Sequence, residues 1–317
     1  MSLFNANLLI RELRKARGLT QEQLAEGICS RSTIAMIEKG NRRPDRFIFF
    51  QTMYKLGVEP SHFSSELLSE EDVFFVNCHT ELQRLVVSSN YKMLREKLDE
   101  IENDDRFKSG QGLEVFLGNS CAYYAHSNDK NPERALDYAL RLLTLRRPDF
   151  DINKLDQYFL SAFEISMAGI IAAIYIELYG HEKAAEIRRM VIRNYEKNYT
   201  AKNYAIQNAY IVQLCGLANN LLEIKQYEEC IEVASQAIEI ATGNNYAARL
   251  YMESIRPKAL ALRHLNQTKE AEHLYKRYLM HIWAMGEHMD AQNTLFDEEK
   301  KTWETRFGYP LDLTLPW

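Results

Sequence analysis

Apolar residues recur every three to four positions along nearly the whole chain, a spacing that gathers them on one face of a helix. Glycine (13) and proline (7) are scarce for 317 residues, so long helices can continue without a break. The pattern therefore predicts an all-α fold. At 317 residues the chain is too long for one small domain and fits two, since domains usually have about 100–200 residues.

Residues 1–67 are expected to hold five short helices. The first ends at Gly18, and Thr20 caps the second, with Gln23 placed to return the hydrogen bond in a capping box. After a tight turn, Ser30 caps the third helix. Two short helices joined by a tight turn, the second of them capped, form a DNA-reading unit whose second helix enters the major groove.

The third helix is expected over residues 31–39, and Gly40 suits the left-handed position that ends it. A fourth helix then runs to Gly57, and a short fifth helix begins near Pro60. This arrangement predicts an N-terminal five-helix domain.

The candidate DNA contacts are the side chains on the outer side of this unit. They are Gln21, Arg31, Ser32, Thr33, Met36, Lys39, Asn41, Arg42 and Arg43. An arginine at the start of the recognition helix can form two hydrogen bonds to guanine, which discriminates by about 1–3 kcal/mol. Gln21 is placed to hold a phosphate, and the basic residues after the helix to contact the flanking backbone. The alternative is a small helical domain that contacts protein instead of DNA.

The charge distribution supports this division of the chain. The net charge is −5, but residues 1–66 contain ten Lys/Arg and seven Asp/Glu, so their net charge is +3 and that of the remainder is −8. A small basic part suits phosphates, while the larger acidic part has another role.

From about residue 70 the sequence predicts helix pairs, because a similar phrase follows each short polar break. The phrases begin at residues 91, 132, 181, 227 and 268, so they recur every 41 to 49 residues. Each has a small or apolar residue at its fourth position, where the two helices of a pair come close: Leu94, Ala135, Ala184, Cys230 and Ala271. Such recurrence predicts an α-solenoid.

A solenoid curves, so the first helix of each pair is expected to line a groove. The candidate peptide contacts in that groove are Asn119, Tyr123, Asn208, Asn219, Glu223 and Arg256. An asparagine amide can donate to one peptide carbonyl and accept from one N–H, and an arginine can hold a carboxylate. For any single one of these residues, a solvated or structural role is the alternative.

Residues 68–290 hold the predicted helix pairs, and residues 291–317 a further helix and an apolar tail, FGYPLDLTLPW. The tail is expected to cap the last pair; docking on another subunit is the alternative.

No catalytic or nucleotide-binding motif is recognisable, so we expect a protein that is not an enzyme and needs no cofactor. His181-Glu182 lacks a second histidine at zinc-binding spacing, and no metal site is expected. Five cysteines without a C-x-x-C pair suit a reduced cytoplasm. Neither a secretory signal nor an apolar run of about 20 residues is recognisable, so no membrane association is expected.

The run GLTQEQLAEGICSRSTIAMIEKGNRRPD resembles the Xre/Cro-type helix-turn-helix, which opens L-T-Q-x-x-L-A and closes I-E-x-G. The helix pairs resemble tetratricopeptide repeats, most clearly in QYEECIEVASQAIEIA. Their periods exceed the usual ~34 residues, so armadillo- or HEAT-type pairs stay open as an alternative.

Together the two parts resemble the peptide-pheromone-responsive regulators of Gram-positive bacteria, of the Rgg, PlcR and PrgX types. The resemblance implies a homodimer that binds palindromic double-stranded promoter DNA and responds to a short signalling peptide in its groove. Two alternatives stay open: a regulator whose helix pairs bind a protein partner, and a repressor whose helix pairs only dimerise.

Overall fold

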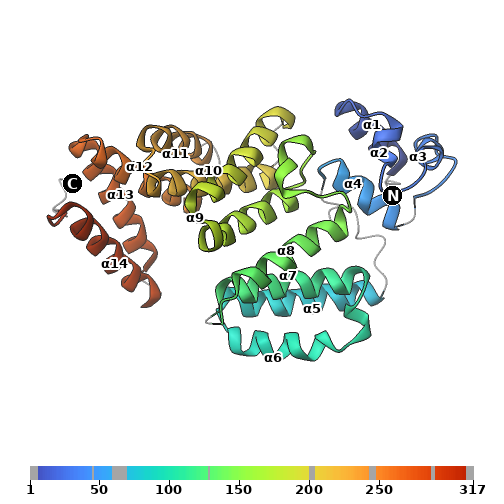
Figure 1. Ribbon diagram of the computed structural model, residues 1–317, viewed down its shortest axis with the longest axis horizontal. Helices are drawn as coiled ribbons and strands as arrows, with labels where there is room; N and C mark the ends of the chain where they lie inside the picture. Colours follow the sequence, from blue (N-terminus) through green and yellow to red (C-terminus); the bar gives the residue numbers. More distant parts are fainter. Residues whose placement is uncertain are drawn as a thin grey trace. The chain divides into compact units, whose positions relative to one another are not determined.

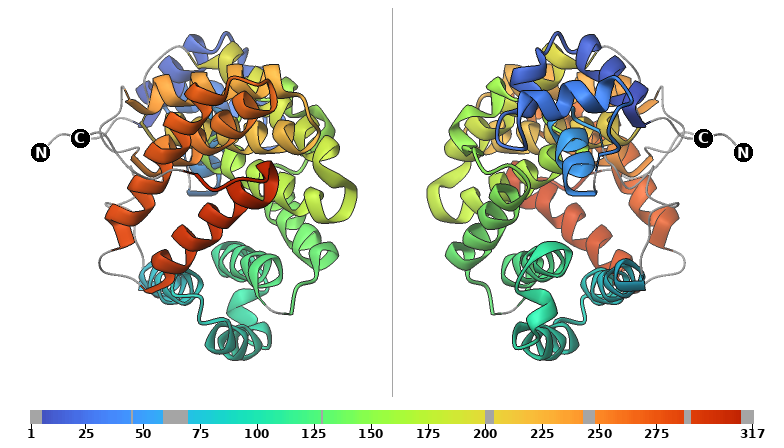
Figure 2. Two further views of the ribbon diagram at one scale, coloured as in Figure 1. Left: turned by 90° about the vertical axis from the view of Figure 1, so that its left-hand side faces the viewer. Right: turned by 90° about the vertical axis from the view of Figure 1, so that its right-hand side faces the viewer.

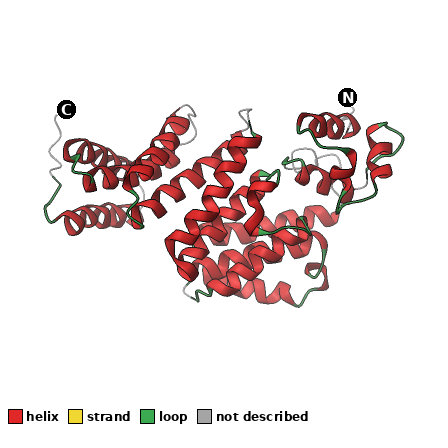
Figure 3. Cartoon of the chain, turned by 45° about the horizontal axis from the view of Figure 1, so that its top comes forward, coloured by secondary structure: helices red, strands yellow, loops and turns green. Residues whose placement is uncertain are grey.

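The computed structural model describes residues 6–44, 46–58, 70–127, 129–199, 204–242, 248–286 and 290–311. Within these ranges the regular structure is helical and contains no strand (Figure 3), which confirms the predicted all-α class. The chain divides into two compact units, Met1–Ala209 and Tyr210–Trp317. The N-terminal domain belongs to the first unit together with the first helix pairs.

Four helices of the N-terminal domain are described (Figure 1): α1 Ala6–Ala16, α2 Gln21–Ala25, α3 Arg31–Glu38 and α4 Arg46–Lys55. Ile10, Leu24, Ile34, Ile37 and Met53 form a core that is closed to solvent. One core residue or more comes from each helix, so burial of these side chains holds the four together. The predicted fifth helix near Pro60 lies outside the described residues.

The predicted start and stop signals of these helices are confirmed. The Thr20 hydroxyl accepts from the Gln23 N–H (3.1 Å), and the Gln23 side chain accepts from the Thr20 N–H (2.8 Å), so the capping box is complete. The Ser30 hydroxyl accepts from the N–H of Thr33 (3.2 Å) at the start of α3. Gly40 follows α3 with φ +79°, a left-handed conformation that glycine adopts without strain.

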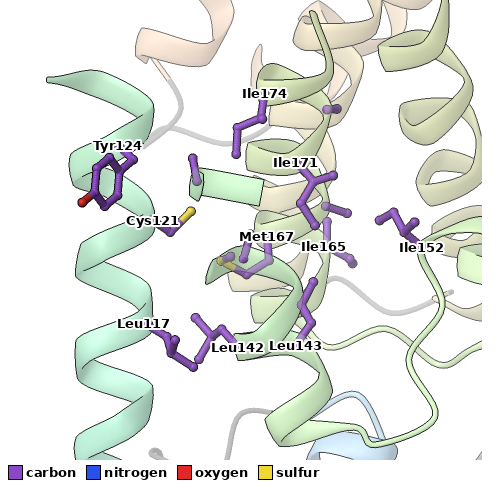
Figure 4. Packing of buried hydrophobic residues seen from close by; sticks show 14 of the residues in the cluster. Leu117, Cys121, Tyr124, Leu142, Leu143, Ile152, Ile165, Met167, Ile171 and Ile174 are labelled. Carbon is purple, nitrogen blue, oxygen red and sulfur yellow. The ribbon is translucent and has the colours of Figure 1, made fainter. Parts of the chain in front are cut away.

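The rest of the first unit contains α5 Glu70–Val87, α6 Tyr91–Glu102, α7 Gly110–His126, α8 Pro132–Arg146 and α9 Ala162–Asn198, with short 3₁₀ helices at Asp105–Phe107 and Ile152–Gln157. Gly180 (φ +83°) divides α9 into two helices of one pair. Figure 4 shows Leu117 of α7 directed toward Leu142 of α8, with Cys121 of α7 and Met167 and Ile171 of α9 in the same buried cluster.

The boundary between the units falls within α10 (Tyr204–Glu223). The second unit continues with α11 Tyr227–Thr242, α12 Ala248–His264, α13 Thr268–Gly286 and α14 Asp290–Phe307. Helices α11, α12, α13 and α14 each pack on the next, and the last two lie side by side in Figure 2. The predicted succession of helix pairs is therefore present in both units.

Each of the five repeated phrases opens the second helix of a pair, as predicted. Residues 91, 132, 227 and 268 are the first residues of α6, α8, α11 and α13, and residue 181 follows the break in α9. The five residues at the fourth position are all completely buried: Leu94, Ala135, Ala184, Cys230 and Ala271. Where two helices pack closely, this position needs a small side chain, as in four of the five phrases, or an apolar side chain that fills the space, as Leu94 does.

Three of the pairs share the same turn. Ser89, Lys225 and Asn266 have positive φ angles of 54°, 63° and 62°. In each case the next residue donates its N–H to the carbonyl five residues earlier, at 2.9 Å, as in the hydrogen bond from Asn90 to Leu85. This is the Schellman arrangement that ends a helix, and its repetition gives these three pairs the same reversal.

The C-terminal helix covers the end of the last pair. Trp303 of α14 is completely buried and Leu311, after it, nearly so. The Tyr275 hydroxyl of α13 donates to the Glu299 carboxylate (2.8 Å). These contacts agree with the predicted capping role of this segment; residues 312–317 of the tail lie outside the described residues.

By length and composition, one helix of the described residues, α9, is apolar enough to cross a membrane. Core helices of soluble proteins share these properties, and Gly180 interrupts α9 midway. Glu164 near its start is buried in an ion pair with Arg147 (2.7 Å), which suits packing within a protein. The absence of membrane association stays a prediction.

Candidate nucleic-acid interface

The position of α3 is set by a buried carboxylate at its end. Glu38, whose side chain is 4% exposed, accepts from Arg14 Nε (2.6 Å) and Nη2 (2.9 Å) on α1, and from Gln21 Nε2 (2.9 Å) on α2. Arg14 Nη1 also donates to the carbonyl of Leu19 (2.7 Å), in the connection between α1 and α2. One ionic cluster therefore ties three helices together. Sequence reasoning used this glutamate only as part of the motif I-E-x-G and missed its role.

The electrostatics of the cluster favour the charged glutamate. Burial alone would raise the pKa of Glu38, but the hydrogen bonds from Arg14 and Gln21 and the positive charge of Arg14 outweigh it, so its pKa lies below the ordinary value. The carboxylate is therefore ionised at neutral pH, and α3 is held rigidly against α1 and α2.

The start of α3 presents side chains to solvent. Arg31 and Ser32 are exposed and Met36 is 40% exposed, so these three predicted contacts are available to base edges. Thr33 is buried, and its hydroxyl is hydrogen-bonded to that of Ser30 (2.9 Å), so it supports the helix start. Gln21 donates from its amide to Glu38 (2.9 Å), so its backbone N–H and its second amide proton are what it can offer to a phosphate.

Exposed basic residues follow α3. Lys39, Asn41, Arg42 and Arg43 are exposed, and within the described ranges the three cations form no ion pair. Their charge is therefore not neutralised by described neighbours and can be directed to phosphates. Seven of the nine predicted DNA contacts are therefore exposed at the start of α3 or just after its end. They are Arg31, Ser32, Met36, Lys39, Asn41, Arg42 and Arg43.

The predicted peptide contacts of the first unit are less exposed to solvent than the predicted DNA contacts. The Asn119 side chain is buried, accepts from Gln83 Nε2 (2.9 Å) and donates to the Val115 carbonyl (2.7 Å). Tyr123 is buried as well. Asn208 is half-buried, and its Oδ1 has no hydrogen-bond partner among the described residues.

In the second unit, two of the three candidates form ion pairs with α14. Arg256 Nε is held by the Glu299 carboxylate (2.8 and 3.0 Å), and Glu223 accepts from Arg306 (3.0 Å) while staying exposed. Asn219 is half-buried and donates to the carbonyl of Cys215 (2.9 Å). The six predicted peptide contacts therefore differ widely in access, and their role stays a prediction.

The structure adds a solvent-facing row of residues on the first helix of two successive pairs. The row on α9 contains Ser166, Ile170, Ala173 and Glu177, and the row on α10 contains Val212, Gly216, Asn219 and Glu223. Each member of the second row lies 46 residues after its counterpart in the first, so the rows occupy equivalent repeat positions. Ile170 and Val212 escaped sequence reasoning, because an exposed isoleucine or valine has the pattern of a core residue.

Comparison with known proteins agrees with the N-terminal geometry. A family model described as helix-turn-helix matches residues 10–51. An uncharacterized HTH-type transcriptional regulator of Methanothermobacter thermautotrophicus is 42% identical over 65 residues, which are 20% of this chain and 91% of that protein.

Two solved structures are similar over the full length. PlcR of Bacillus thuringiensis, crystallised with the peptide PapR7 and DNA, has a TM-score of 0.55 and 21% identity, covering 91% of this chain and 98% of its own. A variant of the Streptococcus dysgalactiae SHP pheromone receptor Rgg2 has a TM-score of 0.48 and 11% identity, covering 95% and 98%. The similarity to PlcR shows that the fold is shared through both the N-terminal domain and the helix pairs. The chain therefore belongs to the helix-turn-helix transcriptional regulators, proteins that bind DNA and are not enzymes, and its N-terminal domain is of the Xre type.

Proposed function

We propose that this regulator is a cytoplasmic homodimer that binds a short peptide on tetratricopeptide-like helix pairs and thereby changes its affinity for promoter DNA. The observation that carries the proposal is the pair of equivalent solvent-facing rows on α9 and α10. In each row one exposed apolar side chain, Ile170 (36% exposed) or Val212 (42% exposed), lies within about two turns of small and polar residues, so each row offers apolar contact and polar groups together. The PlcR structure with peptide and DNA, which has the same fold, supports the idea.

The composition of the rows suits a peptide. On each row a small residue, Ala173 on α9 or Gly216 on α10, lets an extended chain approach that helix, and Ile170 or Val212 of the same row offers apolar contact to its side chains. Asn219 has one further amide proton and a carbonyl oxygen for a peptide backbone, since one proton is already bound to Cys215. Affinity would come from burial of apolar side chains, and the hydrogen bonds of the Asn219 amide would fix the position of the peptide along the helix.

Peptide binding alters DNA affinity only if the two arrangements of the dimer bind the peptide unequally. A coupling free energy of ~1–3 kcal/mol, typical of such linkage, corresponds to a change of about 5- to 150-fold in operator affinity. The sign of the coupling decides whether the peptide strengthens or weakens operator binding.

The DNA-reading assignment is tested with Arg31→Ala, and Arg141→Ala on α8 serves as a control with the same loss of charge. An operator is first selected from genomic DNA, and affinities are then measured by fluorescence anisotropy. Arg31→Ala is expected to weaken operator binding by about 1–3 kcal/mol and to leave binding to scrambled DNA unchanged. Equal affinity of the unmodified protein for operator and scrambled DNA would contradict the assignment.

The peptide assignment is tested by thermal shift against a library of short hydrophobic peptides, followed by operator binding with each peptide that stabilises the protein. Val212→Glu is expected to abolish the shift, whereas Val87→Glu, at an 83% exposed position outside the rows, retains it. If operator binding is intact and no peptide acts, the helix pairs bind a protein partner or serve only dimerisation.

A further inference from the structure

The DNA-binding domain has a second contact surface, at the end of α4. Arg146, the last residue of α8, places its guanidinium 4.6 Å from the ring centroid of Tyr54 and 3.7 Å from that of Phe163 on α9. Glu114 of α7 accepts a hydrogen bond from the same guanidinium (2.8 Å). A cation held between two rings and a carboxylate joins the DNA-binding domain to three helices of the pairs.

A second contact lies beside the first. Arg17, after α1, directs its guanidinium over the Phe159 ring, 6.0 Å from the centroid, and interacts electrostatically with Tyr199. Gly57, after α4, has φ +68°, and a β-carbon there would collide with the Tyr199 hydroxyl. The backbone at Gly57 therefore approaches Tyr199 as closely as only glycine permits.

Phe159, which receives the Arg17 contact, lies in residues 147–160, a segment that is attached to both ends of α9. Arg147 pairs with Glu164 (2.7 Å) in the first turn of α9. Asn194 in its last turns donates to the Leu155 carbonyl (2.7 Å), and Tyr199 donates to the carbonyl of Leu160. A displacement of the α9 pair would therefore move residues 147–160 and, through them, the DNA-binding domain.

The contacts leave the DNA-reading residues uncovered, because Arg31, Ser32 and Met36 are exposed while the contacts are made. Docking therefore restricts the orientation of α3 and does not block it. A domain held on a flexible tether alone would instead accommodate several distances between half-sites.

The docking surface is defined as Arg17, Tyr54, Gly57, Arg146, Phe159 and Tyr199. We propose that the docking surface fixes the orientation of α3 on the helix pairs and so sets the half-site spacing that the dimer accepts. The proposal rests on the proposed function insofar as it requires two DNA-binding domains in one assembly. Dimeric helix-turn-helix proteins read half-sites about 34–36 Å apart or at multiples of this, so a fixed orientation selects one spacing.

The test compares Gly57→Ala with Gly18→Ala. Both glycines have nearly the same left-handed φ, +68° and +66°, so the strain of an added β-carbon is matched, but only at Gly57 does it meet Tyr199. DNA duplexes carrying two copies of the selected half-site at increasing separation are bound by each full-length protein. The unmodified protein and Gly18→Ala are expected to prefer one separation by about tenfold or more.

Gly57→Ala is expected to bind several separations within about threefold of one another, with single half-site affinity unchanged. Tyr54→Leu, which removes the ring facing Arg146, should behave likewise, and Tyr54→Phe, which keeps the ring, should not. The proposal is overturned if the unmodified protein shows no preferred separation, or if Gly57→Ala and Tyr54→Leu keep that preference. If the unmodified protein selects no DNA sequence at all, the proposed function fails first.

Discussion

The N-terminal domain and the helix pairs use their polar side chains in opposite ways. In the N-terminal domain, the charged Glu38 is buried and links α3 to α1 and α2, whereas the DNA-reading candidates Arg31 and Arg42 are exposed. In the helix pairs, the polar groups that sequence reasoning selected for a ligand are often satisfied by the chain itself. Asn119 bonds to Val115 and Gln83, and Arg256 pairs with Glu299.

The difference comes from what each pattern encodes. In a helix-turn-helix each position of the motif has a fixed structural role, so identifying the caps and glycines also identifies the surface that faces DNA. In a repeat, the recurring positions encode packing between neighbours, as the buried Ala184 and Cys230 show. The repeat period therefore locates helices accurately but does not indicate which polar residue faces a ligand.

The largest expected loss of stability comes from replacing Glu38, the buried carboxylate that links α1, α2 and α3. Glu38→Leu leaves Arg14 without its partner at a mostly buried site, and removing one member of such a pair costs about 3–5 kcal/mol. Hydrogen exchange of the α1–α3 amides measures the loss of local stability directly. Glu299→Leu removes the partner of Arg256, whose side chain is more exposed, and should cost less. An equal or larger loss at Glu299 would remove the contrast between the two regions.

The same carboxylate predicts a pH dependence. Because the pKa of Glu38 is lowered in the folded protein, its contribution to stability is complete above the pKa of an unfolded glutamate. That contribution disappears as the pH falls from about 4.3, the ordinary glutamate value, through the lower folded pKa. Hydrogen exchange of α1–α3 between neutral and acidic pH should show this loss. In Glu38→Gln the local stability should depend less on pH. A slope that Glu38→Gln leaves unchanged would assign the acid sensitivity to other carboxylates.

A smaller effect tests the packing role of the repeat positions. Ala184→Leu inserts a large side chain into a closed site and is expected to destabilise the protein by about 1–3 kcal/mol. Ala173→Leu, at an exposed position on the same helix pair, is the matched control and should change stability by less than ~0.5 kcal/mol. Thermal unfolding of both variants makes the comparison. Similar melting temperatures would mean that the fourth position does not control the close approach of the helices.

Much of the fold could be predicted from the sequence because its signals are local. The capping box at Thr20, the cap at Ser30 and the start of α11 at Tyr227 follow from residues a few positions apart. The site was predictable only as far as the motif extends. The pairing of Arg256 with Glu299, 43 residues away, and the row that contains Val212 depend on how helices distant in sequence pack. No local pattern encodes either.

The cap of the recognition helix allows a finer test of the N-terminal domain. Ser30→Ala removes the acceptor for the Thr33 N–H and should cost about 1 kcal/mol of helix stability. Because Arg31 and Ser32 follow directly, fraying of this turn should also weaken operator binding. Ser30→Asp, which retains an acceptor, is expected to preserve both properties. A normal affinity in Ser30→Ala would show that DNA itself can order the start of α3.

The smallest effect separates structure from ligand binding in the helix pairs. Glu223 and Arg306 form an exposed ion pair (3.0 Å), so breaking it from either side should cost less than ~1 kcal/mol and depend on salt. Glu223→Gln and Arg306→Gln should therefore shift the melting temperature equally. If Glu223 contacts the peptide, Glu223→Gln alone should lower peptide affinity, whereas Arg306→Gln frees the carboxylate and should preserve or raise it. Equal effects on peptide affinity would assign Glu223 to the attachment of α14 and leave Asn219 as the polar contact on that row.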